Sequence, residues 1–126
     1  MREAITAPDA PAAIGPYSPA FRVGSLLFIS GQIPIDPATG DLTDGGVEAQ
    51  TEQVMRNLGA LLGAAGAGFE HVVRTTIFLA DMNDFAIVNT VYGGHLADPP
   101  PARATVEVAR LPRDVRVEID AIAVLD

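Results

Sequence analysis

Hydrophobic and polar positions alternate along this chain in short segments with a period of two, which is typical of β-strands. Turn-forming Gly, Pro, Asn and Asp residues separate these segments, which are rich in β-branched and aromatic side chains. We expect strands at Glu3–Thr6, Tyr17–Val23, Leu26–Ser30, Val72–Leu79, Ala102–Val108 and Val115–Val124. The tight Gly24-Ser25 connection predicts a hairpin between the second and third strands.

Two other segments repeat apolar residues every three or four positions, which predicts amphipathic helices. The first helix is expected over Val47–Ala65, and Gly66 supplies its stop signal. Its inward stripe consists of Val47, Thr51, Val54, Met55, Leu58, Leu61, Leu62 and Ala65. The second helix is expected to begin at a cap formed by Asp81 or Asn83 and to end early at Gly93-Gly94. Its inward stripe consists of Phe85, Val88, Tyr92 and Leu96.

The order of these elements is β-β-β-α-β-α-β-β, within a single domain that spans residues 1–126. Both helices follow and precede strands, so both can cover one face of a mixed sheet of about six strands in an α+β fold. The other face of the sheet is then left open although its strands are largely apolar. Because monomers rarely expose large apolar patches, we predict a homo-oligomer.

Composition excludes several kinds of chemistry. The chain has no cysteine and no lysine, and all eight basic residues are arginine. A thiolate nucleophile, a Schiff-base lysine and the lysine of a phosphate-binding loop are therefore excluded. His71 and His95 lie far apart without the spacing of metal ligands, so we expect no metal site.

The charge and hydropathy of the chain limit the kinds of molecule that it can bind. The net charge of −8 disfavours binding to a nucleic acid, because a polyanion is repelled. No apolar run reaches the roughly 18 residues that span a membrane, and the N-terminus lacks a signal-peptide pattern. We therefore expect a cytoplasmic protein that does not enter a membrane and that binds a small molecule.

Arg103 is the most informative candidate residue, because an arginine within an apolar strand needs an anion to satisfy its planar fork of donors. A small carboxylate would fit this fork, and Glu118 on the last strand could hold or deprotonate a water molecule. The short 109–114 connection predicts that these two strands are antiparallel neighbours, so the two side chains could approach each other. An internal ion pair between them is the open alternative. Ser30-Gly31-Gln32 could present backbone N–H groups to a ligand.

Several segments occur together in one order over residues 3–125. They are Gly15-Pro16-Tyr17-Ser18-Pro19, Leu27-Phe28-Ile29-Ser30-Gly31-Gln32-Ile33-Pro34, Gln50-Thr51-Glu52-Gln53, Asp81-Met82-Asn83-Asp84-Phe85 with Val88-Asn89, Pro101-Ala102-Arg103 and Val117-Glu118-Ile119. These segments resemble the Rid (RidA/YjgF) family of enamine/imine deaminases. The resemblance implies a chorismate-mutase-like fold and a homotrimer with sites at its subunit interfaces.

The resemblance also implies an activity: hydrolysis of 2-iminobutanoate and 2-iminopropanoate to 2-keto acids and ammonia, without a cofactor or a metal. Arg103 would bind the substrate carboxylate, and Glu118 would position the attacking water. The remaining pocket residues implied by the resemblance are Tyr17, Ser30, Gly31, Asn89 and Thr105. Thr105 stands where many relatives have cysteine. This difference need not remove activity, because water is the nucleophile and the backbone N–H at this position could contact the substrate equally well.

Three other functions compete with this one. A non-catalytic module that binds keto acids or acts like a chaperone could use the same arginine. Ribonuclease activity is attached to parts of the family, but the acidic charge and the missing lysines disfavour it. A pericyclic isomerase would share the fold, although fold alone does not determine function and a dianionic substrate would need more than one inward arginine.

Overall fold

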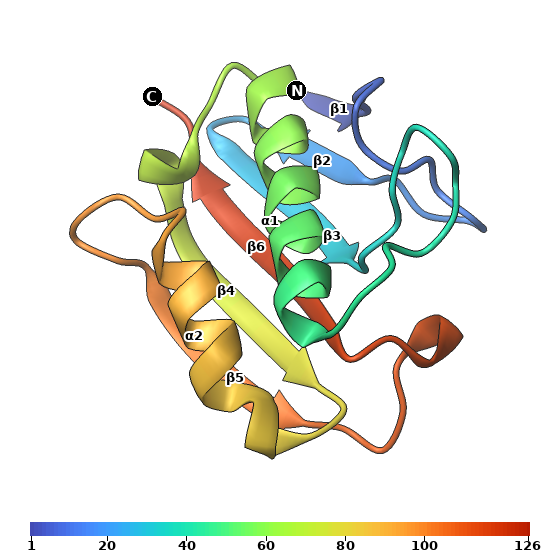
Figure 1. Ribbon diagram of the computed structural model, residues 1–126. Coiled ribbons are helices and arrows are strands. Elements are labelled where there is room, and N and C mark those ends of the chain that lie inside the picture. The colour runs from blue at the N-terminus through green and yellow to red at the C-terminus, as the bar shows by residue number, and fades with distance from the viewer.

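The computed structural model describes all 126 residues, which form two layers: a six-stranded mixed sheet and two helices that cover one of its faces (Figure 1). The strands are β1 (Arg2–Ile5), β2 (Ala20–Val23), β3 (Leu26–Gln32), β4 (Val72–Leu79), β5 (Ala102–Glu107) and β6 (Val117–Val124). The helices are α1 (Val47–Ala64) and α2 (Phe85–Gly93). Short 3-10 turns occupy Phe69–His71, Met82–Asp84 and Pro112–Asp114. The predicted α+β class and the order of elements are confirmed.

The strands lie in the order β1-β2-β3-β6-β4-β5, and only β4 and β5 are parallel. β6 is therefore a central strand between β3 and β4, whereas β5 is an edge strand. The predicted pairing of β5 with β6 is wrong. The reason is that α2 forms the crossover from β4 to β5, and such a crossover places two parallel strands side by side. The chain then passes β4 before it enters the sheet as β6.

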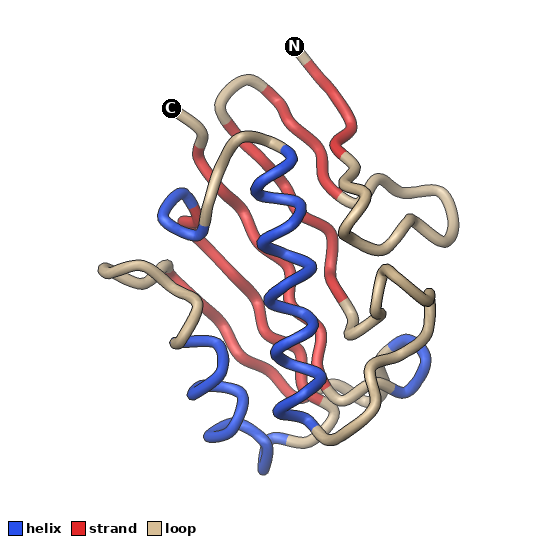
Figure 2. The backbone as a smooth tube through the Cα atoms, turned by 45° about the horizontal axis from the view of Figure 1, so that its top comes forward, coloured by secondary structure: helices blue, strands red, loops and turns tan.

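The core lies between the sheet and α1, the long helix that crosses the sheet in Figure 2. Leu58, Leu61 and Leu62 of α1 are almost completely buried, as are the inward residues Ile119 and Ala123 of β6. The helix ends as the sequence predicts. Gly66 has a φ of 78°, and the N–H of Ala67 donates to the carbonyl of Leu62 at 2.8 Å, so a left-handed C-cap closes the last turn.

The face of the sheet opposite the helices is open, as predicted. Large apolar side chains on this face remain 36–42% exposed: Val23, Leu26, Phe28, Val106 and Val124. Cross-strand register places them on one surface, because Phe28 pairs with Phe21 and Ile122, and Leu26 pairs with Val23 and Val124. Association of copies through this face stays a prediction. Neither helix combines the length and hydropathy that a membrane-spanning segment needs.

Several element boundaries differ from those expected. β2 begins at Ala20 rather than Tyr17, because Pro19 cannot donate a ladder hydrogen bond. β6 begins at Val117, two residues late, since a turn occupies Pro112–Asp114. α2 does end at Gly93, so Leu96 packs against the core from the following loop rather than from the helix.

Candidate active site

The first candidate surface is a cavity of about 520 Å³ beside the end of β3. Tyr17, Ser30, Gly31 and Glu118 all line it, so the structure brings together four of the seven site residues named from the sequence. We call this cavity the Glu118 pocket. Its remaining wall is mainly apolar and includes Ile14, Ile33, Ile35 and three prolines, with Gln32 and Arg113 as further polar members.

Glycine at position 31 makes room for the glutamate. The register of β3 against β6 shifts between Ile29 and Gln32, and this irregularity brings Gly31 against Glu118. A Cβ at position 31 would overlap the Glu118 carboxylate. The sequence interpretation assigned this glycine to the approach of a ligand, whereas the structure gives it the role of seating the carboxylate. Beside it, the hydroxyl of Ser30 donates to the carbonyl of Ser18 at 2.7 Å.

Burial raises the pKa of the Glu118 carboxyl group above its usual range, and the nearby carboxylate of Asp120 adds to this increase. Asp120 is held in place because its Oδ1 accepts a hydrogen bond from the backbone N–H of Thr76 at 3.1 Å. A carboxylate with a raised pKa is a stronger base near neutral pH than an ordinary glutamate. Glu118 can therefore take a proton from water at a partly desolvated position.

The second candidate surface surrounds Arg103 on the edge strand β5. Its Nη1 donates to Oδ1 of Asn89 at 2.6 Å, and its guanidinium carbon lies 5.3 Å and 5.6 Å from the ring centroids of Tyr92 and Phe85. Tyr92 is fixed in turn by a 2.6 Å hydrogen bond between its hydroxyl and that of Thr75. We call these residues the Arg103 cluster. The guanidinium is exposed and uses one of five donors, so the others can receive an anion.

Thr105 lies two residues further along β5, on the same face as Arg103. Its Oγ1 is buried and has no hydrogen-bond partner. A role of the Thr105 side chain in binding stays a prediction.

Arg103 and Glu118 lie on opposite faces of the sheet. Arg103 pairs with the buried Thr75 and therefore points to the helix side, whereas Glu118 alternates with buried Val117 and Ile119 and points to the open side. The two residues are also two strands apart, or about 10 Å across the sheet. The expected approach of the two side chains within one chain is wrong, and an internal ion pair is excluded.

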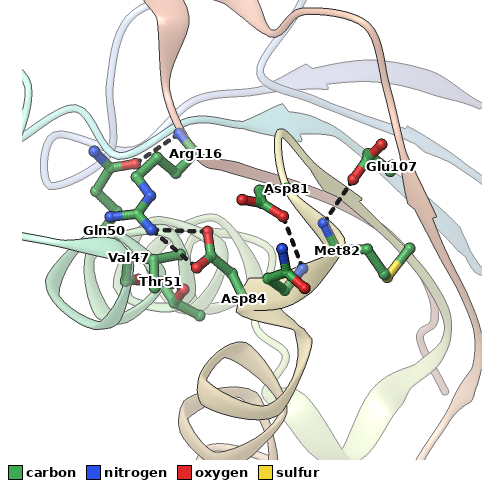
Figure 3. Close-up of polar contacts among 9 residues, drawn as sticks. Val47, Gln50, Thr51, Asp81, Met82, Asp84, Glu107 and Arg116 are labelled. Atoms are coloured by element: carbon green, nitrogen blue, oxygen red, sulfur yellow. Dashed lines mark hydrogen bonds and ion pairs between the residues drawn. The ribbon is translucent and has the colours of Figure 1, made fainter.

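Phe85 and Tyr92 were interpreted from the sequence only as core residues, and their role beside Arg103 was missed. Their helical spacing with Asn89, which the resemblance had placed in the pocket, could have shown that all three share a face. No local signal indicates that Arg113 lines the Glu118 pocket. No local signal indicates the hydrogen bonds in Figure 3 either. The backbone N–H of Arg116 donates to Oε1 of Gln50 at 2.9 Å, and the backbone N–H of Met82 donates to Oε1 of Glu107 at 2.8 Å.

The fold and the two surfaces define a class of protein: a small two-layer α+β domain that presents an oriented cation and a weakly acidic carboxyl group on separate faces. The family model described as "Endoribonuclease L-PSP" matches residues 7–125. The chain therefore belongs to this family, which is the Rid (YjgF) family that the sequence resembled.

Similar proteins extend over nearly the whole chain. Protein DfrA from Myxococcus xanthus is 59% identical over 125 residues, which cover 98% of this chain and 95% of that protein. The 2-iminobutanoate/2-iminopropanoate deaminase of Mus musculus is 52% identical over 124 residues. The match covers 98% of this chain and 92% of that protein. A crystal structure of E. coli TdcF with bound serine is 41% identical, with a TM-score of 0.91 and coverage of 98% and 99%.

Proposed function

We propose that this protein hydrolyses 2-imino acids such as 2-iminobutanoate and 2-iminopropanoate to 2-keto acids and ammonia. The observation that carries the proposal is the exposed guanidinium of Arg103, which Asn89 and two aromatic rings orient while most of its donors stay unused. This arrangement suits a planar carboxylate, which a guanidinium binds with two parallel hydrogen bonds. The deaminase name of the mouse relative supports the same chemistry.

We further propose that the working site forms between copies of the chain in a homotrimer. A four-carbon imino acid is too short to contact Arg103 and Glu118 of the same chain, because they lie on opposite faces of the sheet. A neighbouring copy could bring its Arg103 cluster to the Glu118 pocket of the first. The exposed apolar side chains of the open face favour such packing.

In this mechanism Arg103 holds the substrate carboxylate, and Glu118 accepts a proton from a water molecule while the water oxygen bonds to C2 of the imine. The electron pair of the C=N bond moves to nitrogen, Glu118 returns the proton to that nitrogen, and a carbinolamine forms. In the second step Glu118 takes the hydroxyl proton of the carbinolamine as the C=O bond forms, and it passes this proton to the amino nitrogen. The C–N bond breaks and ammonia leaves. One water is consumed for each keto acid and ammonia formed.

A coupled assay tests the proposed activity. A threonine dehydratase supplies 2-iminobutanoate, and formation of 2-ketobutanoate is compared with the spontaneous rate. We expect acceleration by the native chain, loss of most activity in Arg103→Ala and little rescue in Arg103→Lys, because lysine lacks the planar fork. Arg56→Ala removes an exposed arginine from α1 and serves as the matched control. Full activity in Arg103→Ala would contradict the proposal.

Mixing two inactive variants tests the shared site. Arg103→Ala and Glu118→Gln chains, unfolded and refolded together, would place an intact Arg103 cluster beside an intact Glu118 pocket at about a quarter of the interfaces of random trimers. We expect partial recovery of activity in the mixture and none in either variant refolded alone. Light scattering gives the number of chains in each refolded assembly. If the mixed chains assemble as trimers but recover no activity, the shared site is excluded.

Binding of keto acids without catalysis is the second candidate function. It is favoured by the independence of the Arg103 cluster, whose contacts do not involve Glu118. Calorimetry with 2-ketobutanoate distinguishes the two functions. Glu118→Gln should abolish turnover and keep keto-acid binding if the protein is an enzyme, whereas binding by a native chain without any turnover would favour the binding module.

A further inference from the structure

The Glu118 pocket contains a second charged residue, which the proposed mechanism does not use. Of the thirteen residues that line this cavity, only Glu118 and Arg113 carry a charge. Arg113 is exposed, and its guanidinium forms no hydrogen bond or ion pair within the chain, in contrast to the guanidinium groups of Arg103, Arg110 and Arg116. All five of its donors can therefore receive a ligand that enters the cavity.

The backbone presents Arg113 from an unusual turn. Arg113 has a φ of 56° and a ψ of 21°, and Asp114 has a φ of 57°, so two consecutive residues other than glycine adopt the left-handed region. This conformation is unfavourable for side chains with a Cβ and persists only where surrounding contacts enforce it. Residues in such conformations concentrate at ligand-binding sites, which makes the turn a candidate for function.

Contacts on both sides hold this turn. Leu111 and Val115 are buried at its two ends, with exposed fractions of 6% and 1%. The N–H of Asp114 donates to the carbonyl of Leu111 at 3.0 Å. Arg110 donates to the Asp114 carboxylate at 2.7 Å and 3.2 Å, and these hydrogen bonds lower the pKa of Asp114. Arg113 is thus displayed at the cavity by a fixed backbone.

We propose that Arg113 is a specificity-determining residue that makes this pocket favour 2-imino acids with a second carboxylate at the end of the side chain. The inference rests on the proposed function, in which Arg103 of a neighbouring copy holds the first carboxylate. The cavity of about 520 Å³ has room for a side chain longer than that of 2-iminobutanoate, since cavities of about 300–1,000 Å³ accommodate drug-sized ligands. In a protein with a net charge of −8, a second carboxylate near Glu118 needs a cation beside it.

Two imines of equal carbon number test the preference. An amino-acid oxidase generates 2-iminoglutarate from glutamate and 2-iminopentanoate from norvaline, and semicarbazide traps whatever escapes hydrolysis. We expect the ratio of kcat/KM for the acidic imine to that for the apolar imine to fall about three- to fivefold in Arg113→Gln at low ionic strength, as for a partly exposed ion pair. Arg113→Lys keeps the charge and should retain most of the preference.

Arg56→Gln removes the same charge from an exposed position on α1 outside the Glu118 pocket and should leave the ratio unchanged. High salt should reduce the difference between the native chain and Arg113→Gln, because exposed charges are screened. An equal ratio in the native chain and Arg113→Gln, with both imines hydrolysed, would overturn the inference and leave the proposed function intact.

Binding of the product keto acids tests the same residue independently of turnover. Calorimetry with 2-oxoglutarate and 2-oxopentanoate should show about three- to fivefold weaker binding of the dicarboxylate to Arg113→Gln and no change for the monocarboxylate. This result would support the role of Arg113 even if neither imine were hydrolysed, in which case only the proposed activity fails. Equal weakening of both ligands, or no measurable binding of 2-oxoglutarate to the native chain, would overturn it.

Discussion

Arg116 donates two hydrogen bonds, of 2.9 Å and 3.0 Å, from one guanidinium nitrogen to the two carboxylate oxygens of Asp84 (Figure 3). Arg116 stands two residues before Glu118, and Asp84 directly precedes α2, the helix whose Asn89 and Tyr92 orient Arg103. This single ion pair therefore links the segment that carries the Glu118 pocket to the helix that supports the Arg103 cluster.

Loss of the Arg116 side chain should destabilise the fold. Asp84 is only 7% exposed, so Arg116→Ala leaves a buried carboxylate without its cation. We expect the free energy of unfolding to fall by about 2 kcal/mol, the size typical of hydrogen bonds to a charged group. The loss should be smaller than for a fully buried pair, because the Arg116 side chain is 46% exposed. Urea unfolding at a fixed protein concentration measures this change. Arg110→Ala breaks an exposed pair with Asp114 and should have little effect; a similar loss in both variants would contradict the argument.

Gly31→Ala should reduce activity more than its size suggests. The added methyl group would overlap the Glu118 carboxylate and displace it within the pocket, so kcat should fall severalfold even where the fold survives. Gly63→Ala is the matched control, because a Cβ on this exposed position of α1 meets nothing within 4 Å. It should raise the free energy of unfolding by up to about 1 kcal/mol and leave kcat unchanged. Unchanged kcat in Gly31→Ala would show that the carboxylate position is unimportant.

The pH profile of kcat/KM should report Glu118. Because burial and Asp120 raise its pKa, activity should fall on acidification with a midpoint above the ordinary glutamate value of about 4.3. Asp120→Asn removes the neighbouring charge and should move that midpoint to lower pH. Asp44→Asn, at an exposed position in the loop before α1, should leave the midpoint in place. A midpoint that does not respond to Asp120→Asn would assign the ionisation to another group.

Glu118→Gln should stabilise the protein while it abolishes turnover. Folding raises the pKa of Glu118, so the folded state binds this proton more tightly than the unfolded chain does. Stability therefore falls as pH rises through the two pKa values, and the ionised glutamate is unfavourable at neutral pH. The variant should have a higher Tm than the native chain at pH 7.5, and this difference in Tm should shrink towards pH 4. A difference that grows in acid would contradict the argument.

The sequence predicted the elements of the fold well, because their signals are local. The apolar period of Val47–Ala65, the β-branched segment Val72–Leu79 and the stop at Gly66 each depend on residues within a few positions of one another. The pairing of β5 with β4 rather than β6 was missed. It depends on how α2 directs the crossover, and the short 109–114 connection gave the misleading signal.

The candidate site was also predictable only in part, because it depends on how distant segments are arranged in the sheet. The pattern of alternation identified which residues share a strand face with Arg103 and with Glu118, but it cannot state which face of the sheet each one occupies. Arg113 enters the pocket through a turn with positive φ values. Aspartate is enriched in this conformation, but no local preference of arginine indicates it.

The opposite orientations of Arg103 and Glu118 would make the rate depend on how much protein is present. If the proposed shared site is the working one, a lone chain could keep its circular dichroism spectrum and still turn over nothing. On dilution towards the dissociation point, the specific activity would then fall instead of staying constant, and cellular abundance would itself regulate the reaction.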